Sequence, residues 1–132
     1  IPEKGELPDT DLSKKLMMET IKHSDFTIGI NTTAMIDSII LGTPCLAIIK
    51  NEYNQNQIQT PHFNKVMREE IFINIHDEKS IIHRINEFNL KEKSLITNKM
   101  NEFVKNFCRP SGINISAGKK AYDEIDSLIK NN

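Results

Sequence analysis

The stretch that most constrains the fold of this chain covers residues 24–49, SDFTIGINTTAMIDSIILGTPCLAII. Residues 26–30 alternate β-branched and apolar side chains, which predicts a strand. A small polar cluster then leads into an unbroken helical pattern over 34–41, which a Gly-Thr-Pro corner closes. Residues 45–49 are again apolar and predict a second strand. We therefore expect a strand, a tight turn, a helix and a strand, which is half of a parallel α/β domain.

The turn between the first strand and its helix is where open α/β sheets bind ligands. The first backbone N–H groups of a helix lack intrahelical partners, so they face an approaching anion. Asn31, Thr32 and Thr33 add an amide and two hydroxyl groups there, and Ala34 completes the turn. Gly29 lets the strand end approach a ligand closely. These residues predict a phosphate or diphosphate site; ordinary N-capping of the helix is the alternative, because Asn and Thr are preferred at that position.

Asp37 stands one turn into this helix, among Met, Ile and Leu neighbours. A carboxylate in such surroundings costs desolvation energy unless it is paired. The ribose hydroxyls of a nucleotide would satisfy it. A partly exposed Asp that interacts favourably with the helix dipole is the alternative, and both interpretations stay open.

Composition limits the remaining possibilities. A chain of 132 residues forms one domain, residues 1–132, with no room for a second. Charged residues make up 27% and nearly cancel to a net charge of −1, so we expect no nucleic-acid partner and only a local anion site. We expect the two cysteines, Cys45 and Cys108, to be reduced. The spacing of His, Cys, Asp and Glu predicts no metal site, and the lack of a long apolar run predicts a cytoplasmic protein.

The whole chain predicts an α/β fold, a Rossmann-like parallel sheet flanked by helices, with extra C-terminal helices. Residues 1–9 should form an extended connector. Residues 50–65 should form an irregular loop at the same sheet edge as the polar turn, followed by a helical turn at 66–70. The expected helices cover residues 10–23, 33–41, 77–88, 91–107 and 116–130, and the expected strands 26–30, 45–49 and 71–75.

Apolar periodicity also predicts which helix faces are buried. The first helix should place Leu12, Leu16, Met17 and Ile21 on one face. The helix at 77–88 should bury Ile81, Ile82 and Ile85. The last helix should bury a face made of Ala117, Ala121, Ile125, Leu128 and Ile129.

Residues 24–49 resemble the donor-nucleotide segment in the C-terminal domain of GT-B glycosyltransferases. That pattern is s-D-x-v-i-x-x-x-S/T-x-x-x-x-E/D-x-x-x-x-G-x-P-x-l, and the matching residues here are Asp25, Thr32 or Thr33, Asp37, Gly42 and Pro44. The chain is most similar to bacterial surface-polysaccharide and CDP-glycerol-type transferases, which share a segment like the FCRPSG of residues 107–112 before a last helix. The likeness covers most of the chain, although its specific motifs occupy about a quarter.

The resemblance implies a C-terminal half-domain of the GT-B fold that binds a nucleotide-activated sugar or polyol donor without a cofactor. The acidic residue of the family holds the ribose, and the turn before it holds the diphosphate. Asp37 stands where Glu is usual, so its reach is shorter. His62 would contact the donor from the loop, with an exposed loop histidine as the alternative. Arg109 offers a planar guanidinium to a phosphate, or else anchors the end of a helix.

The resemblance also implies that this chain is part of a larger two-domain protein, with the missing N-terminal domain carrying any general base. The chain alone is then inactive, and its uncovered apolar surface should cause self-association. The full-length protein would lie in the cytoplasm, peripheral to the inner face of the membrane. A UDP-GlcNAc 2-epimerase-like enzyme is an alternative of the same fold, and a catalytically silent nucleotide- or partner-binding module is an alternative of another class.

Overall fold

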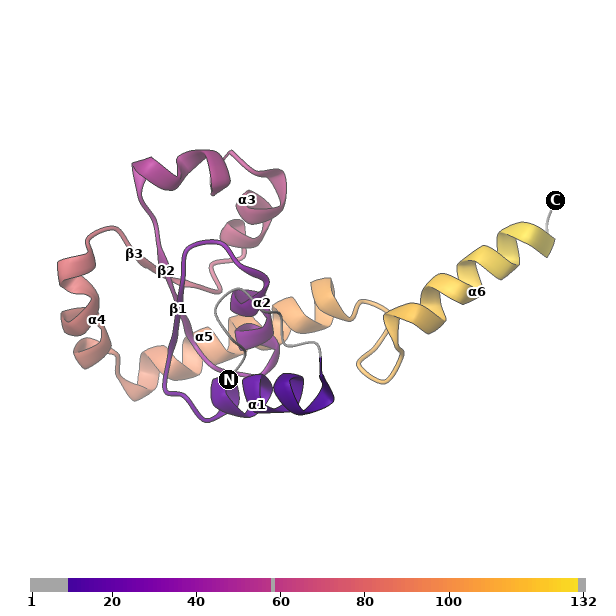
Figure 1. The fold of residues 1–132 in the computed structure, drawn as a ribbon, viewed down its shortest axis with the longest axis horizontal. Coiled ribbons are helices and arrows are strands. Elements are labelled where there is room, and N and C mark those ends of the chain that lie inside the picture. Colours follow the sequence, from indigo (N-terminus) through magenta and orange to yellow (C-terminus); the bar gives the residue numbers. More distant parts are fainter. Residues whose placement is uncertain (1–9, 58, 131–132) are drawn as a thin grey trace.

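A small parallel sheet forms the centre of the protein (Figure 1). The computed structural model describes residues 10–57 and 59–130, so the expected connector at 1–9 lies outside the described residues. The strands β1 (Thr27–Gly29), β2 (Cys45–Ile48) and β3 (Ile73–Ile75) lie in this order, and all neighbours are parallel. The expected α/β class is therefore confirmed.

Helices connect and flank the strands in nearly the expected order. They are α1 (Asp11–Lys22), α2 (Thr33–Ile40), the 3-10 helix η1 (Asn51–Asn56), α3 (Pro61–Arg68), the 3-10 helix η2 (Glu78–Ser80), α4 (Ile81–Glu87), α5 (Leu90–Phe103), its π-helical continuation η3 (Val104–Cys108) and α6 (Ala117–Lys130). Side chains cap two of them: Thr10 Oγ1 accepts a hydrogen bond from Ser13 N, and Ser116 Oγ accepts one from Lys119 N, both at 3.1 Å.

Alternation along β2 divides the core between the two faces of the sheet. Cys45 and Ala47 face α2, α3 and α5, where they join the main apolar cluster. Leu46 faces the other way and packs with Ile73 and Ile75 beneath α4. In Figure 1, α2 and α4 accordingly lie on opposite sides of the strands. β2 is thus covered on both faces, as its continuous apolar sequence predicts.

A chain of hydroxyl groups, from half-buried Thr27 to buried Ser38 and Thr43, fixes α2 against β1 and α1. The hydroxyls of Thr27 and Ser38 lie 2.7 Å apart, and Ser38 Oγ donates to the carbonyl of Thr43 at 2.9 Å. Thr43 Oγ1 in turn donates to the carbonyl of Ile21 at 2.8 Å. Gly42, with φ of 82°, turns the chain from α2 toward β2. These hydrogen bonds therefore hold the carboxyl-terminal half of α2 against β1 and the end of α1.

The expectation of an irregular loop over residues 50–65 is wrong. Residues 51–56 form η1, and α3 begins at Pro61, five positions before the helical turn expected at 66–70. Pro61 occupies the first helical turn, where its missing N–H has no cost, and Thr60 stands at the N-cap. Phe63 and Val66, three residues apart, bury the inner face of α3. The helix is amphipathic but mostly polar. Because it has few apolar residues, the periodicity of apolar residues did not predict it.

Several expected core positions are exposed. Leu12 of α1 is 78% exposed, although Ile21 on the same helix is buried as expected. Ile82 of α4 is 69% exposed, because its neighbours Ile81 and Ile85 are the ones that turn toward the sheet.

The largest departure is α6, which extends away from the rest of the molecule (Figure 1). Its expected buried face is exposed throughout, at Ala117, Ala121, Ile125, Leu128 and Ile129. Periodicity correctly located an apolar stripe, but it does not say whether a partner covers that stripe.

Candidate functional site

A pocket of about 490 Å³ opens at the carboxyl-terminal edge of the sheet, where β1 passes into α2. Asn31, Thr32 and Thr33 line one side, and His62 on the first turn of α3 lines another. The remaining lining side chains are apolar and come from α2, α3 and the approach to β3: Met35, Ile36, Phe63, Val66 and Phe72. The structure thus brings together four of the residues that the sequence singled out.

The hydroxyl groups of the turn are not used to cap α2. Thr32 has the extended backbone of an N-cap residue, with φ of −137° and ψ of 154°, but within the described chain its side chain makes no capping hydrogen bond. Thr32, Thr33 and Ala34 are all exposed. The N-capping alternative therefore explains the backbone position of Thr32 and leaves its hydroxyl group available to a ligand.

Asn31 contributes differently from the two threonines. Its side-chain Nδ2 donates a hydrogen bond to the backbone carbonyl of Asn56, at the end of η1. The amide nitrogen of Asn31 is thus committed to holding the 51–56 segment beside the turn. Asn31 shapes the pocket wall, and its carbonyl oxygen remains for other partners.

Gln57 is the residue of this site that sequence reasoning missed. Its side chain is 0% exposed, and its Nε2 donates to the carbonyls of Ile30 at 2.7 Å and Ile48 at 2.6 Å. It thereby joins the ends of β1 and β2. The sequence offered no local signal, because Gln55 and Gln59 stand in the same polar run.

Gly29 has a packing role beside the pocket. A Cβ atom added to it would lie 2.6 Å from Cγ and 2.7 Å from Sδ of Met35. The sequence suggested that Gly29 makes room for a ligand. In the structure, it makes room for the Met35 side chain, which in turn lines the pocket.

Three predicted site residues do not line this pocket: Ala34, which is exposed within the turn, Asp37 and Arg109. Asp37 is half-buried on α2, one turn beyond Thr33, and its carboxylate makes no hydrogen bond or ion pair with any described residue. Arg109 follows η3 and lines a separate hollow of about 320 Å³ beside α6. The ribose role of Asp37 and the donor contact of Arg109 stay predictions.

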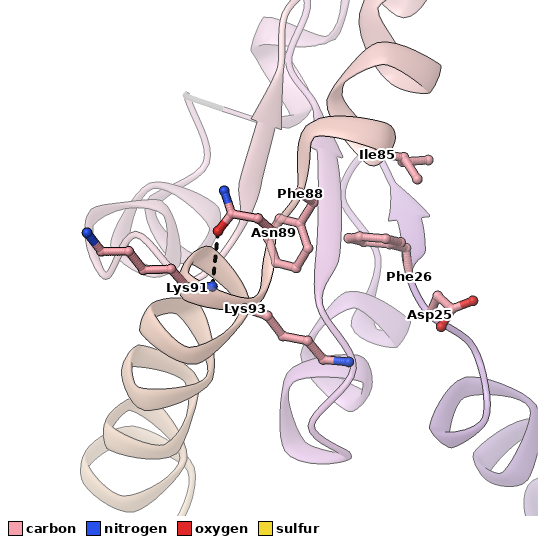
Figure 2. Close-up of a pocket in the computed structure, with 7 residues that line it drawn as sticks. All are labelled: Asp25, Phe26, Ile85, Phe88, Asn89, Lys91 and Lys93. Atoms are coloured by element: carbon pink, nitrogen blue, oxygen red, sulfur yellow. Dashed lines mark hydrogen bonds between the residues drawn. The ribbon is translucent and has the colours of Figure 1, made fainter.

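A second hollow, of about 700 Å³, lies at the opposite, amino-terminal edge of the sheet (Figure 2). The rings of Phe26 and Phe88 form its apolar centre, edge to face with centroids 5.1 Å apart. Figure 2 shows the Asp25 carboxylate and the Lys91 ammonium group pointing away from these rings in different directions. Because its polar groups do not converge on one point, we place the candidate site at the Asn31 pocket.

The cysteines are unsuited to nucleophilic chemistry. Burial raises the pKa of the Cys45 thiol to about 11, although a hydrogen bond with Thr27 opposes the shift. Burial also raises the pKa of Cys108 above its ordinary value. Both thiols are free and protonated at neutral pH.

Among residues 10–57 and 59–130, no group of three or more His, Cys, Asp or Glu side chains is placed to hold a metal ion. No helix in this part of the chain is long and apolar enough to cross a membrane. Comparisons of the chain with known protein families, curated proteins and solved structures found no match.

Proposed function

We propose that this chain is the donor-nucleotide-binding part of a GT-B-type transferase, which moves a sugar or polyol phosphate from a nucleotide-activated donor. The diphosphate of the donor binds at the turn formed by Asn31, Thr32, Thr33 and Ala34. The supporting observation is the pocket in which two hydroxyl groups free of capping bonds and His62 share one opening at the start of α2.

The chemistry of this arrangement suits a diphosphate. Hydroxyl and N–H groups donate charge-assisted hydrogen bonds to phosphate oxygens, and the positive end of the α2 dipole favours their negative charge. Met35, Phe63 and Phe72 give the same pocket an apolar wall, against which the uncharged part of a nucleotide can pack. A site of this kind accelerates transfer by holding the donor and stabilising the departing diphosphate. The chain alone then binds the donor without turning it over.

Calorimetric titration with UDP, CDP and GDP tests the proposal, with uridine as the ligand that lacks phosphate. We expect at least one diphosphate to bind and uridine to bind far more weakly. In the double variant Thr32→Ala/Thr33→Ala, two hydrogen bonds to a charged group are lost at about 1.5–3 kcal/mol each, so affinity should fall by at least 100-fold.

Thr20→Ala is the matched control, because Thr20 is an exposed helical threonine whose hydroxyl donates to the Leu16 carbonyl in α1. It should leave affinity unchanged. A wild-type chain that ignores all three diphosphates up to millimolar concentration would contradict the proposal, as would a double variant that binds like the wild type. Either result would favour a catalytically silent module in which the turn only begins a helix.

The ribose role of Asp37 has its own test. Asp37→Ala should weaken UDP binding and leave the binding of inorganic diphosphate unchanged, because only UDP carries a ribose. The thermal midpoint should change little. Equal losses for both ligands would refute a ribose contact, and unfolding of the variant would show that Asp37 is structural.

A further inference from the structure

The side chain of Gln57 closes the gap between two strand ends. Both of its N–H groups are used, on the carbonyls of Ile30 and Ile48, and its Oε1 accepts a hydrogen bond from Lys50 N at 3.4 Å. Ile30 directly follows β1, and Ile48 ends β2. The amide therefore continues the pairing of the two strands beyond their ladder and supplies a donor to a carbonyl at the end of each strand.

The backbone of Gln57 reaches the other side of the pocket. Its carbonyl accepts hydrogen bonds from Thr60 N at 2.9 Å and Thr60 Oγ1 at 2.7 Å. Thr60 is the N-cap residue of α3, and His62 lies on the first turn of that helix. On the first side, Ile30 is bonded to Gln57 and is followed directly by Asn31. One residue is thus hydrogen-bonded to the segments that carry both walls.

We infer that Gln57 is the positioning residue of the pocket, which holds the turn at Asn31, Thr32 and Thr33 at a fixed separation from His62. For ligand binding, this inference rests on the function proposed above. For the geometry of the two walls, it rests on the hydrogen bonds of Gln57 alone. Gln57 contacts no ligand in this scheme and acts through the residues that it places.

Substitutions of Gln57 can separate the contribution of its hydrogen bonds from that of its side-chain volume. Gln57→Met keeps the length of the side chain and removes every donor and acceptor. Gln57→Glu keeps the shape but replaces both N–H groups with oxygen. An ionised carboxylate would then face two carbonyl oxygens, whereas a protonated one can donate to one of them. Gln55→Met is the matched control, because Gln55 is an exposed glutamine in the same segment.

Binding of UDP and inorganic diphosphate is measured by calorimetry at neutral pH, beside the thermal midpoint of each variant. Loss of the hydrogen bonds of Gln57 should lower affinity by about tenfold or more in Gln57→Met. Gln55→Met should bind like the wild type. Wild-type affinity in Gln57→Met would overturn the inference.

The pH profile of Gln57→Glu distinguishes positioning from a merely structural role. Burial against two carbonyls raises the pKa of the introduced carboxyl, so it is neutral and donating at low pH and ionised at high pH. Affinity relative to the wild type should be highest at pH 5, where one of the two hydrogen bonds is kept, and should fall as the pH rises to 8. The titratable groups on adjoining segments, Lys50, Glu52 and His62, occur in both proteins and cancel in this ratio. A ratio independent of pH would overturn the inference.

Failure of the proposed function is distinguishable from failure of this inference. If the wild-type chain binds none of UDP, CDP, GDP and inorganic diphosphate, the proposed function fails. The amide chemical shifts of the unliganded protein then still test whether Gln57 positions the two pocket walls. Gln57→Met should then move the amide resonances of Thr32 and Thr33 and also those of His62 and Phe63. Chemical-shift changes confined to residues 51–57 would overturn the inference about Gln57. Should Gln57→Met not fold, Gln57→Glu at pH 5 and pH 8 supplies the same comparison.

Discussion

Replacing Gly29 with alanine tests the packing beneath the candidate site. The added Cβ would lie 2.6 Å from Met35 Cγ, whereas ordinary van der Waals contact begins at 3.4 Å. Met35 is 3% exposed and has little room to move. Forcing extra atoms into a close-packed core typically costs about 1–3 kcal/mol.

A second effect of the same substitution opposes this packing cost. Alanine restricts the unfolded chain more than glycine does, which stabilises the folded state by about 0.4–1 kcal/mol where the backbone suits it. The backbone at Gly29 does suit it, because its φ is not positive. Taking the middle of each range, a cost of about 2 kcal/mol less about 0.7 kcal/mol, we expect Gly29→Ala to lower the free energy of unfolding by about 1.3 kcal/mol and the thermal midpoint by roughly 4–8 °C.

A double-mutant cycle with Met35→Ala, measured by urea unfolding, tests whether the Met35 side chain causes the cost of Gly29→Ala. Met35→Ala removes the Cγ and Sδ atoms that the new methyl group would meet, so in that background Gly29→Ala should be neutral or stabilising. Gly118→Ala in α6 is the control, because its added Cβ meets nothing within 4 Å and should not destabilise the protein. An equal cost of Gly29→Ala in both backgrounds would refute the role given to Met35.

Three further predictions use other parts of the molecule. A hydrogen bond from Arg84 holds the pKa of Glu92 below its ordinary value of 4.5, so its stabilisation is present above that pH and is lost as the pH falls through the lower folded value. The stability difference between the wild type and Arg84→Met in urea should shrink from pH 7 to pH 3; an unchanged difference would exclude this pair as its source. Alkylation followed by mass spectrometry at pH 8 should label Cys108 before the fully buried Cys45, and the reverse order would contradict the burial described. The exposed apolar stripe of α6 should give concentration-dependent light scattering, which a clean monomer at high concentration would refute.

The strand, turn and helix around Asn31 could be predicted because their signals are local. Alternating apolar residues mark β1, and the Gly-Thr-Pro corner ends α2, so the elements were placed to within one or two residues. The meeting of Asn31 and His62 was also predictable in outline. The carboxyl ends of neighbouring parallel strands share one edge, so the segments that follow β1 and β2 must approach each other there.

The helix α3 and the exposure of α6 could not be predicted in the same way. α3 has few apolar residues, and its start depends on Thr60 and Pro61, whose sequence is equally typical of a turn. The apolar stripe of α6 is as regular as that of a buried helix. Whether such a stripe is covered depends on where the preceding segment directs the helix, which no pattern within the helix encodes.

The chemistry of the proposed site and its geometry are specified in different parts of the sequence. The groups that would bind a diphosphate lie together in one turn, so a local pattern finds them. Their distance from His62 depends on Gln57, whose hydrogen bond to Ile30 spans 27 positions of the chain. Substitutions at Thr32 and Thr33 should therefore reduce affinity without reducing stability, since these hydroxyls carry no capping bond. Substitutions at Gln57 should reduce both, because the same buried amide joins the strands and sets the pocket walls.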